Sequence, residues 1–318
     1  MKIAILDDYQ DACRTLDAWA TLAGHDVTVF RDTLKDEDAL VARLKDFDAL
    51  VLIRERTRLT TSLLERLPKL RALSQTGKAG AHIDVAACKR LGIAILEGSG
   101  SPYATSELTW GLVLAAMRRI PQEVENLRKG GWQQSVGRAL RGRTLGIYGF
   151  GKIGSVVAGY GRAFGMKIQV WGREGSLERA KAAGFEAAAS REALFATSDV
   201  LTIHIRLAPE TRGLVTGQDL ALMKPNALFV NTSRAELVAP GALAAGLVAG
   251  RPGFAAVDVY EEEPVQGAAH PLLALGNAIC TPHLGYVEKD GYELYFGSAF
   301  DNLAAFAKTL PEGKTGGA

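Results

Sequence analysis

The feature that most restricts the fold is a glycine motif placed directly after a short apolar run. The run Leu145–Tyr148 has the residues of a buried strand, and the sequence G-F-G-K-I-G follows it at positions 149–154. A helical stretch, Val156–Phe164, comes next, and another strand-like run follows that helix. In such a unit the first glycine permits a tight turn, the second lets the backbone approach a pyrophosphate, and the third lets the helix pack closely. The candidate residues of this dinucleotide site are Gly149, Gly151, Lys152, Ile153 and Gly154.

A series of six strand-like runs, separated by helical stretches, begins near residue 144. Alternation of this kind predicts parallel strands covered by helices on both faces, in the doubly wound arrangement of the Rossmann type. The expected strands are Thr144–Tyr148, Lys167–Trp171, Val200–Ile205, Ala227–Asn231, Ala255–Val259 and Ala278–Cys280.

The first hundred residues contain a separate α/β series without a glycine motif, which predicts a second, smaller domain of the flavodoxin-like α/β type. Its expected strands are Lys2–Leu6, Val27–Phe30, Ala49–Ile53, Ala72–Gln75 and Ile93–Leu96, and its expected helices include Glu37–Lys45 and Ser62–Leu67.

Two long helical stretches lie outside both series and indicate how the domains connect. Thr105–Arg119 contains no proline and is expected to stop at Pro121, and Gly291–Lys308 lies too far beyond the last strand to belong to its sheet. We therefore expect a discontinuous substrate (catalytic) domain of residues 1–98 and 288–318, with a dinucleotide-binding domain of residues 99–287 inserted in it. The glycine-rich end, residues 313–318, is expected to fray.

Composition narrows the class of protein. The chain has 318 residues, 47% hydrophobic and 23% charged, with a net charge of +2, which favours a globular protein over a nucleic-acid binder. Its three cysteines form no C-x-x-C pair and are expected to be free thiols in a reducing compartment. No apolar run approaches the roughly 20 residues of a membrane helix, so we expect a cytoplasmic protein without a membrane partner.

The end of the second strand of the later series bears on which dinucleotide binds. An acidic residue there accepts hydrogen bonds from ribose hydroxyls and repels a 2′-phosphate. Here Gly172 and Arg173 stand at that end, so Gly172 makes room and Arg173 can pair with the phosphate. Alternatively, Arg173 is solvated, or the following Glu174 replaces the missing acid and NAD is accepted. We expect NAD(P), with NADP slightly favoured over NAD.

Polar residues follow three of the later strands, where a ligand of such a sheet binds. Reduction of a 2-oxo acid requires three groups of the protein. A guanidinium binds the substrate carboxylate, an acid protonates the forming alkoxide, and a protein carboxylate keeps that acid charged. Arg234, His283 and Glu263 fit these roles. The residues alone do not distinguish Glu263 from its neighbours Glu261 and Glu262.

Over nearly its whole length the sequence resembles the D-isomer-specific 2-hydroxyacid dehydrogenase family. The resemblance is carried by the G-x-G-x-x-G motif, the S-R-x-E-L pattern within Asn231–Leu237, the segment Asp258–Pro264 and the segment Pro282–Gly285. It implies that Arg234 binds substrate, that His283 is the acid/base and that Glu263 is its partner. It also implies that four residues lie on the nicotinamide side, Thr232, Ser233, Asp258 and Gly285. His204, at the end of the third strand, is expected near the cofactor.

The resemblance fails at the family's substrate loop, which here is the segment Ser74–Asp84. Gln75 stands where the family usually has Arg, so Lys78 can take over the binding of an anionic group, with Gly77 offering backbone N–H groups. Alternatively, Lys78 is a solvated loop residue. Arg54, at the end of a strand of the smaller domain, is a second candidate.

These observations predict an enzyme that transfers hydride between NAD(P)H and a small 2-oxo acid of the glyoxylate, hydroxypyruvate or phosphohydroxypyruvate type. The resemblance further implies a homodimer, and no residues at ligand spacing predict a metal. Two alternatives remain, a dinucleotide-sensing corepressor-like binding protein and a dehydrogenase for another small anion such as phosphite.

Overall fold

The computed structural model describes residues 1–310, which form two compact units. Unit 1 contains Met1–Ser101 together with the residues from Glu288 onward, and unit 2 contains Pro102–Val287. The expected division after residue 98 thus lies three residues before the observed one, and the division after residue 287 coincides. The glycine-rich end, residues 313–318, lies outside the described residues.

Unit 1 is a five-stranded parallel sheet with the strand order β2-β1-β3-β4-β5. This is the flavodoxin-like order, so the predicted fold of the smaller domain is confirmed. The strands are β1 (Lys2–Ile5), β2 (Asp26–Val29), β3 (Ala49–Leu52), β4 (Ala72–Gln75) and β5 (Ala94–Glu97). The helices are η1 (Ala12–Thr15), η2 (Asp17–Leu22), α1 (Glu37–Leu44), α2 (Thr61–Glu65), α3 (Val85–Leu91) and α11 (Lys289–Thr309).

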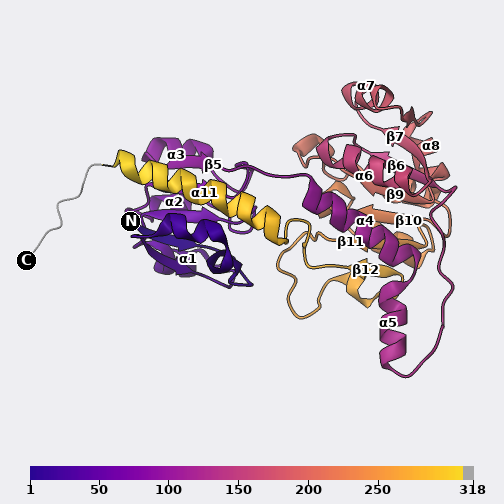
Figure 1. Cartoon of the computed structure of the whole chain (residues 1–318), viewed down its shortest axis with the longest axis horizontal. Coiled ribbons are helices and arrows are strands. Elements are labelled where there is room, and N and C mark those ends of the chain that lie inside the picture. The colour runs from indigo at the N-terminus through magenta and orange to yellow at the C-terminus, as the bar shows by residue number, and fades with distance from the viewer. Residues whose placement is uncertain (311–318) are drawn as a thin grey trace, which may run out of the picture. The chain divides into compact units, whose positions relative to one another are not determined.

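Helix α11 covers one face of the unit 1 sheet, although it comes from the far end of the chain (Figure 1). It packs against η2, β4 and β5, and its buried face includes Phe296, Phe300 and Leu303. Ser74 in β4 donates a hydrogen bond of 2.8 Å to the carbonyl of Ala299. The sheet is therefore covered only when the chain returns to it.

Unit 2 is a seven-stranded parallel sheet with the order β12-β11-β10-β9-β6-β7-β8, which confirms the Rossmann-type doubly wound prediction. The strands are β6 (Thr144–Tyr148), β7 (Lys167–Trp171), β8 (Glu186–Ala187), β9 (Val200–Ile203), β10 (Leu228–Asn231), β11 (Phe254–Val257) and β12 (Ala278–Cys280). The expected number of six strands was wrong. Strand β8 has two residues, both exposed, so it lacks the apolar run by which buried strands are recognised.

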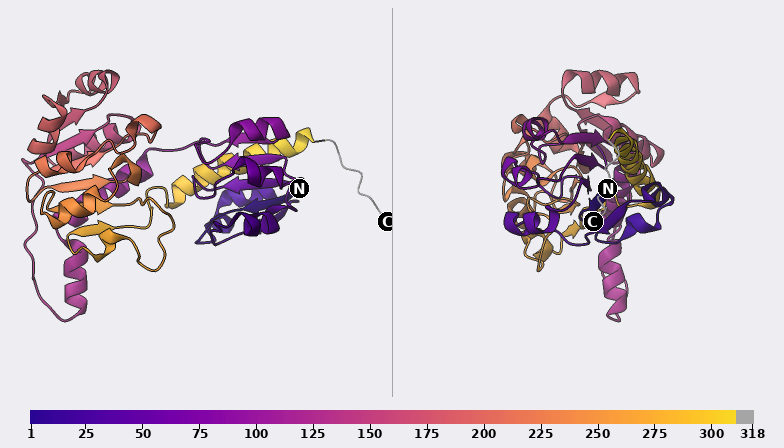
Figure 2. Two further views of the ribbon diagram at one scale, coloured as in Figure 1. Left: turned by 180° about the vertical axis from the view of Figure 1, so that it is seen from behind. Right: turned by 90° about the vertical axis from the view of Figure 1, so that its left-hand side faces the viewer.

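Helices lie on both faces of the unit 2 sheet (Figures 1 and 2). The helices of unit 2 are α4 (Tyr103–Met117), α5 (Ile120–Arg128), α6 (Lys152–Ala163), α7 (Glu174–Ala182), α8 (Arg191–Thr197), η3 (Pro209–Thr211), α9 (Gly217–Leu222), η4 (Ala235–Leu237), α10 (Ala242–Val248) and η5 (Pro271–Ala274).

The expected stop of the long helix at Pro121 was wrong. Helix α4 ends at Met117, Arg119 takes a left-handed conformation with φ of 58°, and α5 begins at Ile120. Proline is tolerated in the first turn of a helix, where no N–H partner is required, so Pro121 starts a helix here. Figure 1 shows α5 projecting away from the sheet of its own unit.

The sheet places the candidate residues of unit 2 along one edge. In a parallel sheet all carboxyl ends lie together, so the loops that follow β6, β9, β10, β11 and β12 meet there. Within residues 1–310, no helix combines the length and apolar character that crossing a membrane requires.

Candidate active site

The glycine motif forms the tight strand-to-helix turn that its spacing predicts. Gly149 has a φ of 97°, and a Cβ atom on it would lie 2.5 Å from the carbonyl oxygen of His204. A Cβ atom on Gly154 would overlap the carbonyl of Gly149, so helix and strand touch at this point. In contrast, a Cβ atom on Gly151 would meet no atom within 4 Å. Gly151 therefore faces open space beside the first N–H groups of α6, and the residues fit a bound pyrophosphate.

His204 closes the turn from the side of β9. Its backbone N–H donates to the carbonyl of Tyr148 over 2.8 Å, and its ring nitrogen Nε2 lies 3.1 Å from the hydroxyl of Thr202. Burial lowers the pKa of His204 to about 3, so its ring is neutral near pH 7. The other ring nitrogen, Nδ1, is buried without a hydrogen-bond partner among the described residues. His204 thus shapes the turn through its backbone and carries no charge to the site.

Close packing explains why the residue directly after β7, Gly172, is a glycine. A Cβ atom on Gly172 would lie 3.0 Å from the Cβ atom of Ser176 in the first turn of α7. Arg173 precedes α7 with its side chain 80% exposed, and its Nη2 lies 3.8 Å from Oε1 of Glu210. Close packing therefore restricts the residue at position 172, and Glu210 would compete with any bound anion for the Arg173 guanidinium.

His283 and Glu263 form a short, half-buried contact. Nδ1 of His283 lies 2.6 Å from Oε2 of Glu263, and the other oxygen of Glu263 accepts a hydrogen bond of 3.0 Å from the N–H of Tyr260. Glu261 instead lies 3.0 Å from Nε2 of His270. Of these two glutamates, Glu263 is thus the one that contacts His283, through the ring nitrogen Nδ1.

The turn that carries His283 is held by the buried carboxylate of Asp258. One oxygen of Asp258 accepts hydrogen bonds from the hydroxyl of Thr281 over 2.6 Å and from the N–H of Leu284 over 2.7 Å. The other oxygen accepts from the N–H of Gly285 over 2.8 Å. His283 itself has a left-handed φ of 52°, which is costly for a residue with a side chain. Asp258 offsets that cost, and its burial raises its own pKa.

The loop after β10 is shaped by the side chain of Asn231. The Asn231 amide nitrogen donates to the carbonyl of Arg234 over 2.8 Å, and its oxygen accepts from the N–H of Ser233 over 3.0 Å. Ser233 donates its hydroxyl proton to the carbonyl of Ile203 in the neighbouring strand. The guanidinium of Arg234 donates to the carbonyl of Ser233 over 2.7 Å. Arg234 is therefore anchored at the same sheet edge as His283.

In unit 1 the candidates Arg54 and Gly77 lie together. A Cβ atom on Gly77 would lie 3.3 Å from Nη1 of Arg54, which places the guanidinium over the loop. The buried side chain of Gln75 donates to the carbonyl of Arg54 over 2.7 Å and contacts Nε2 of His82 at 3.0 Å. The ammonium of Lys78 instead lies 3.2 Å from Glu97. An acid already pairs with Lys78, whereas Gln75 holds the Arg54 backbone in place.

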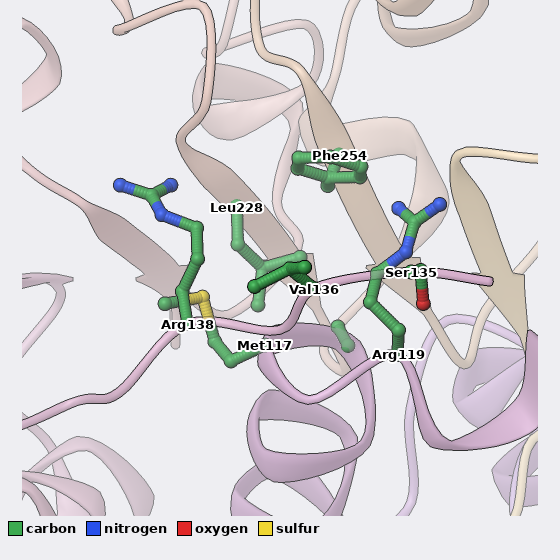
Figure 3. A pocket seen from close by; sticks show the side chains of 8 residues that line it. Met117, Arg119, Ser135, Val136, Arg138, Leu228 and Phe254 are labelled. Carbon is green, nitrogen blue, oxygen red and sulfur yellow. The ribbon is translucent and has the colours of Figure 1, made fainter. Parts of the chain in front are cut away.

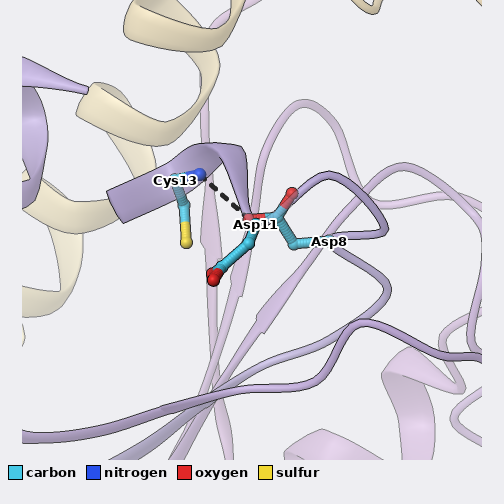
Figure 4. A group of neighbouring side chains, drawn as sticks. All are labelled: Asp8, Asp11 and Cys13. Carbon is cyan, nitrogen blue, oxygen red and sulfur yellow. Dashed lines mark hydrogen bonds between the residues drawn. The ribbon is translucent and has the colours of Figure 1, made fainter. Parts of the chain in front are cut away.

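Three neighbouring side chains, those of Asp8, Asp11 and Cys13, are of types that can bind a metal, but local interactions explain why they lie together (Figure 4). Asp8 accepts from the backbone N–H groups of Ala12 and Cys13, and Asp11 pairs with Arg14 at 2.9 Å. Burial raises the pKa of the Cys13 thiol, which disfavours the thiolate that binds metals. These contacts are those of a capped turn.

A cavity of about 180 Å³ lies at the opposite end of the unit 2 sheet, where β10 and β11 begin (Figure 3). Leu228, Val136 and Phe254 line it between the guanidinium groups of Arg119 and Arg138. Because Leu228 and Phe254 are the first residues of their strands, this cavity is separate from the strand-end loops described above.

Sequence reasoning missed two threonines of α4. The Thr105 hydroxyl donates to the carbonyl of Gly285 over 2.8 Å, and the Thr109 hydroxyl lies 2.7 Å from that of Thr232. The available signal was that two threonines stand one helical turn apart in a mostly apolar helix. The direction in which they point could not be read from that spacing.

Comparison with known proteins identifies the relatives of this chain. It is 38% identical over 281 residues to a glyoxylate reductase of Aeropyrum pernix, with 85% of this chain and 83% of that protein covered. It is 36% identical to a D-3-phosphoglycerate dehydrogenase of Methanocaldococcus jannaschii, with 90% of this chain but only 53% of that longer protein covered.

Among solved structures, a phosphoglycerate oxidoreductase from Vibrio cholerae O395 superimposes with a TM-score of 0.95 at 56% identity, covering 98% of this chain and all of that one. The family model described as the NAD binding domain of D-isomer specific 2-hydroxyacid dehydrogenases matches residues 110–285. The chain therefore belongs to the D-isomer specific 2-hydroxyacid dehydrogenase family.

Proposed function

We propose that this protein reduces a small 2-oxo acid to a D-2-hydroxy acid, or catalyses the reverse reaction, with NAD(P) as cofactor. Membership of the family supports NAD-dependent 2-hydroxyacid dehydrogenase activity. The observation that carries the proposal is the 2.6 Å contact between His283 and Glu263, at the sheet edge that also holds Arg234 and the glycine turn.

The proposed roles follow from the chemistry of these side chains. When bound, the nicotinamide ring supplies or accepts the hydride. Arg234 pairs with the substrate carboxylate and polarises the neighbouring ketone. His283 gives a proton to the forming alkoxide from Nε2, because its Nδ1 already faces Glu263. Glu263 stabilises the charged imidazolium and fixes its orientation.

The proposed substrates are glyoxylate, hydroxypyruvate and phosphohydroxypyruvate, the first and last types being supported by the names of the relatives. In unit 1, Arg54 and Gly77 are proposed to bind an anionic group of the substrate. We place Arg54 ahead of Lys78, because the Arg54 guanidinium lies over the Gly77 loop.

The proposed cofactor preference is slight and favours NADP. Arg173 supports it, since a guanidinium fork suits a phosphate. The neighbouring Glu210 opposes it, because its carboxylate competes for Arg173 and repels a 2′-phosphate. The two opposing charges keep the expected preference small.

The decisive experiment is a panel of 2-oxo acids, each assayed with NADH and with NADPH through the near-ultraviolet absorbance of the reduced cofactor. Steady turnover of at least one acid supports the proposal. Tight binding of the dinucleotide without turnover of any acid would favour the corepressor-like binding protein.

We also propose that two copies of the chain associate through helix α5 and the segment after it. Helix α5 buries no residue, and its apolar side chains Ile120, Val124 and Leu127 recur at the spacing of one helical face. The following segment exposes Trp132 by 76% and Val136 by 95%. Apolar side chains gathered in this way mark an interaction surface, and closed homodimers are the commonest assembly. The test is Trp132→Glu in sedimentation analysis, which should convert a dimer into a monomer.

A further inference from the structure

Helix α4 makes two hydroxyl contacts, one partly buried and one buried, to loops that hold proposed catalytic residues. The Thr105 hydroxyl donates to the carbonyl of Gly285, two residues after His283. The Thr109 hydroxyl contacts that of Thr232, two residues before Arg234. We propose that Thr105 and Thr109 are positioning residues, which set the spacing between the His283 turn and the Arg234 loop. This inference rests on the proposed function.

The peptide of Gly285 is held from both sides. Its N–H donates to Asp258 over 2.8 Å, and its carbonyl accepts from Thr105 over 2.8 Å. The turn needs such support because His283 takes a left-handed conformation, which side chains rarely adopt. Gly285 is also tightly enclosed, since a Cβ atom on it would lie 3.2 Å from Asp258 and 3.5 Å from Thr105. Loss of the Thr105 hydroxyl would leave the partly buried carbonyl of Gly285 without its donor, so the turn would shift.

The second contact has a defined direction. The Thr109 oxygen lies 2.7 Å from both the Thr105 carbonyl and the Thr232 hydroxyl. A hydroxyl has one proton and the Thr105 carbonyl can only accept, so both contacts are satisfied when Thr109 donates to Thr105 and Thr232 donates to Thr109. Thr109 is fully buried and Thr232 nearly so, hence water cannot replace either partner. The Thr232 hydroxyl thus donates its proton to Thr109 of α4, and this bond fixes the loop beginning at Asn231 to the helix.

Threonine is otherwise a poor choice at position 109. The other buried residues of α4 include Trp110, Leu112, Val113 and Met117, which pack in the apolar core. A hydroxyl buried in such surroundings is unfavourable unless it is hydrogen-bonded, and valine has the same shape without that requirement. The Thr109 hydroxyl is therefore placed where it reaches the loop that holds Thr232.

The two contacts should have different kinetic signatures. Thr105→Val should lower kcat about 10-fold with little change in the KM of the 2-oxo acid, because it misplaces the acid His283. Thr109→Val should raise that KM about 10-fold with a smaller change in kcat, because it misplaces the carboxylate clamp Arg234. Thr→Ser at either position keeps the hydroxyl and should restore wild-type values to within about 2-fold.

A matched control is available in the same unit. Ser198 is fully buried and donates to the carbonyl of Leu194, but it precedes β9 at the opposite end of the sheet. Ser198→Ala should lower thermal stability without the selective loss of kcat or the selective rise of KM expected for the threonine variants. The proposal is wrong if the threonine variants behave like Ser198→Ala, or if serine fails to restore the lost parameter.

Amide hydrogen exchange separates this test from the test of the proposed function. Thr105→Val should increase exchange in residues 281–287, where Leu284 and Gly285 donate to Asp258, by about 10-fold. Thr109→Val should increase exchange by a similar factor in residues 231–234. Ser198→Ala should increase exchange in neither segment. If wild type turns over no 2-oxo acid, the proposed function fails, yet exchange still decides whether α4 holds these loops. Unchanged exchange in both segments would overturn the proposal.

Discussion

Replacing Glu263 by Gln removes one charge from the contact on which the proposed mechanism depends. The His283 and Glu263 side chains are only 14% and 18% exposed, so solvent screens their interaction little. A hydrogen bond to a charged group of this kind is worth about 1.5–3 kcal/mol, and about 1.4 kcal/mol corresponds to a factor of ten in kcat/KM. The Glu263 carboxylate orients the His283 ring and stabilises positive charge on it. Its loss should therefore lower kcat/KM for ketone reduction about 10- to 100-fold.

The second oxygen of Glu263 strengthens this expectation. It accepts a hydrogen bond from the N–H of Tyr260. In Glu263→Gln, the single amide oxygen can accept from Tyr260 or from His283, but not from both. If the amide oxygen keeps Tyr260, the amide NH₂ faces Nδ1 of His283 and cannot accept a hydrogen bond from it. The His283 ring then loses its hydrogen-bond acceptor as well as the negative charge beside it.

The assay is kcat/KM for the best 2-oxo acid, measured for wild type, Glu263→Gln and Glu261→Gln. Glu261 pairs with His270 and serves as the matched control, whose kcat/KM should stay near that of wild type. An unchanged kcat/KM in Glu263→Gln, or an equal loss in Glu261→Gln, would refute the assignment of Glu263 as the partner of His283.

Three further predictions concern the cofactor and the acid. His283→Ala should lower kcat by about 10²–10⁴-fold and leave dinucleotide affinity nearly unchanged in a binding titration; a variant with most of its kcat would place the proton donor elsewhere. Gly151→Ala should leave the melting temperature unchanged but weaken dinucleotide binding, since its methyl group enters open space, whereas Gly154→Ala should lower the melting temperature because the methyl overlaps the Gly149 carbonyl. Arg173→Ala should lower the NADPH-to-NADH ratio of kcat/KM about 10-fold and Glu210→Gln should raise it, so a ratio that neither variant changes would exclude Arg173 as a phosphate contact.

The sequence predicted the elements with strong periodicity and failed where tertiary packing decides. The bounds of β4, β6, β7 and β12 were predicted as they are observed, because each is a compact apolar or β-branched run between polar turns. Strand β8 was missed because pairing with β7 creates it, through the registers Gln169–Glu186 and Val170–Ala187. The start of α5 was missed because a proline inside a helical pattern can end one helix or begin the next.

The same distinction applies to the candidate site. The resemblance to the family singled out His283 and Glu263, but the 2.6 Å contact between them joins residues 20 positions apart and depends on the whole sheet edge. Gln75 was noticed as a departure from the family pattern. The structural role of Gln75 is to link the Arg54 backbone to His82. This role could not be predicted, because the sequence does not show that the two loops are neighbours.

The return of α11 to unit 1 has a consequence for how the protein is made. Strands β4 and β5 emerge from the ribosome early, while the helix that covers them emerges about 190 residues later, as the 225-residue separation of the Ser74–Ala299 hydrogen bond illustrates. At translation rates of about 5–20 residues per second, the delay is roughly 10–40 s. Unit 2 is contiguous and can reach its native packing during that interval. The unit whose synthesis begins first is therefore the one whose folding finishes last, and its uncovered sheet face is available to chaperones in the meantime.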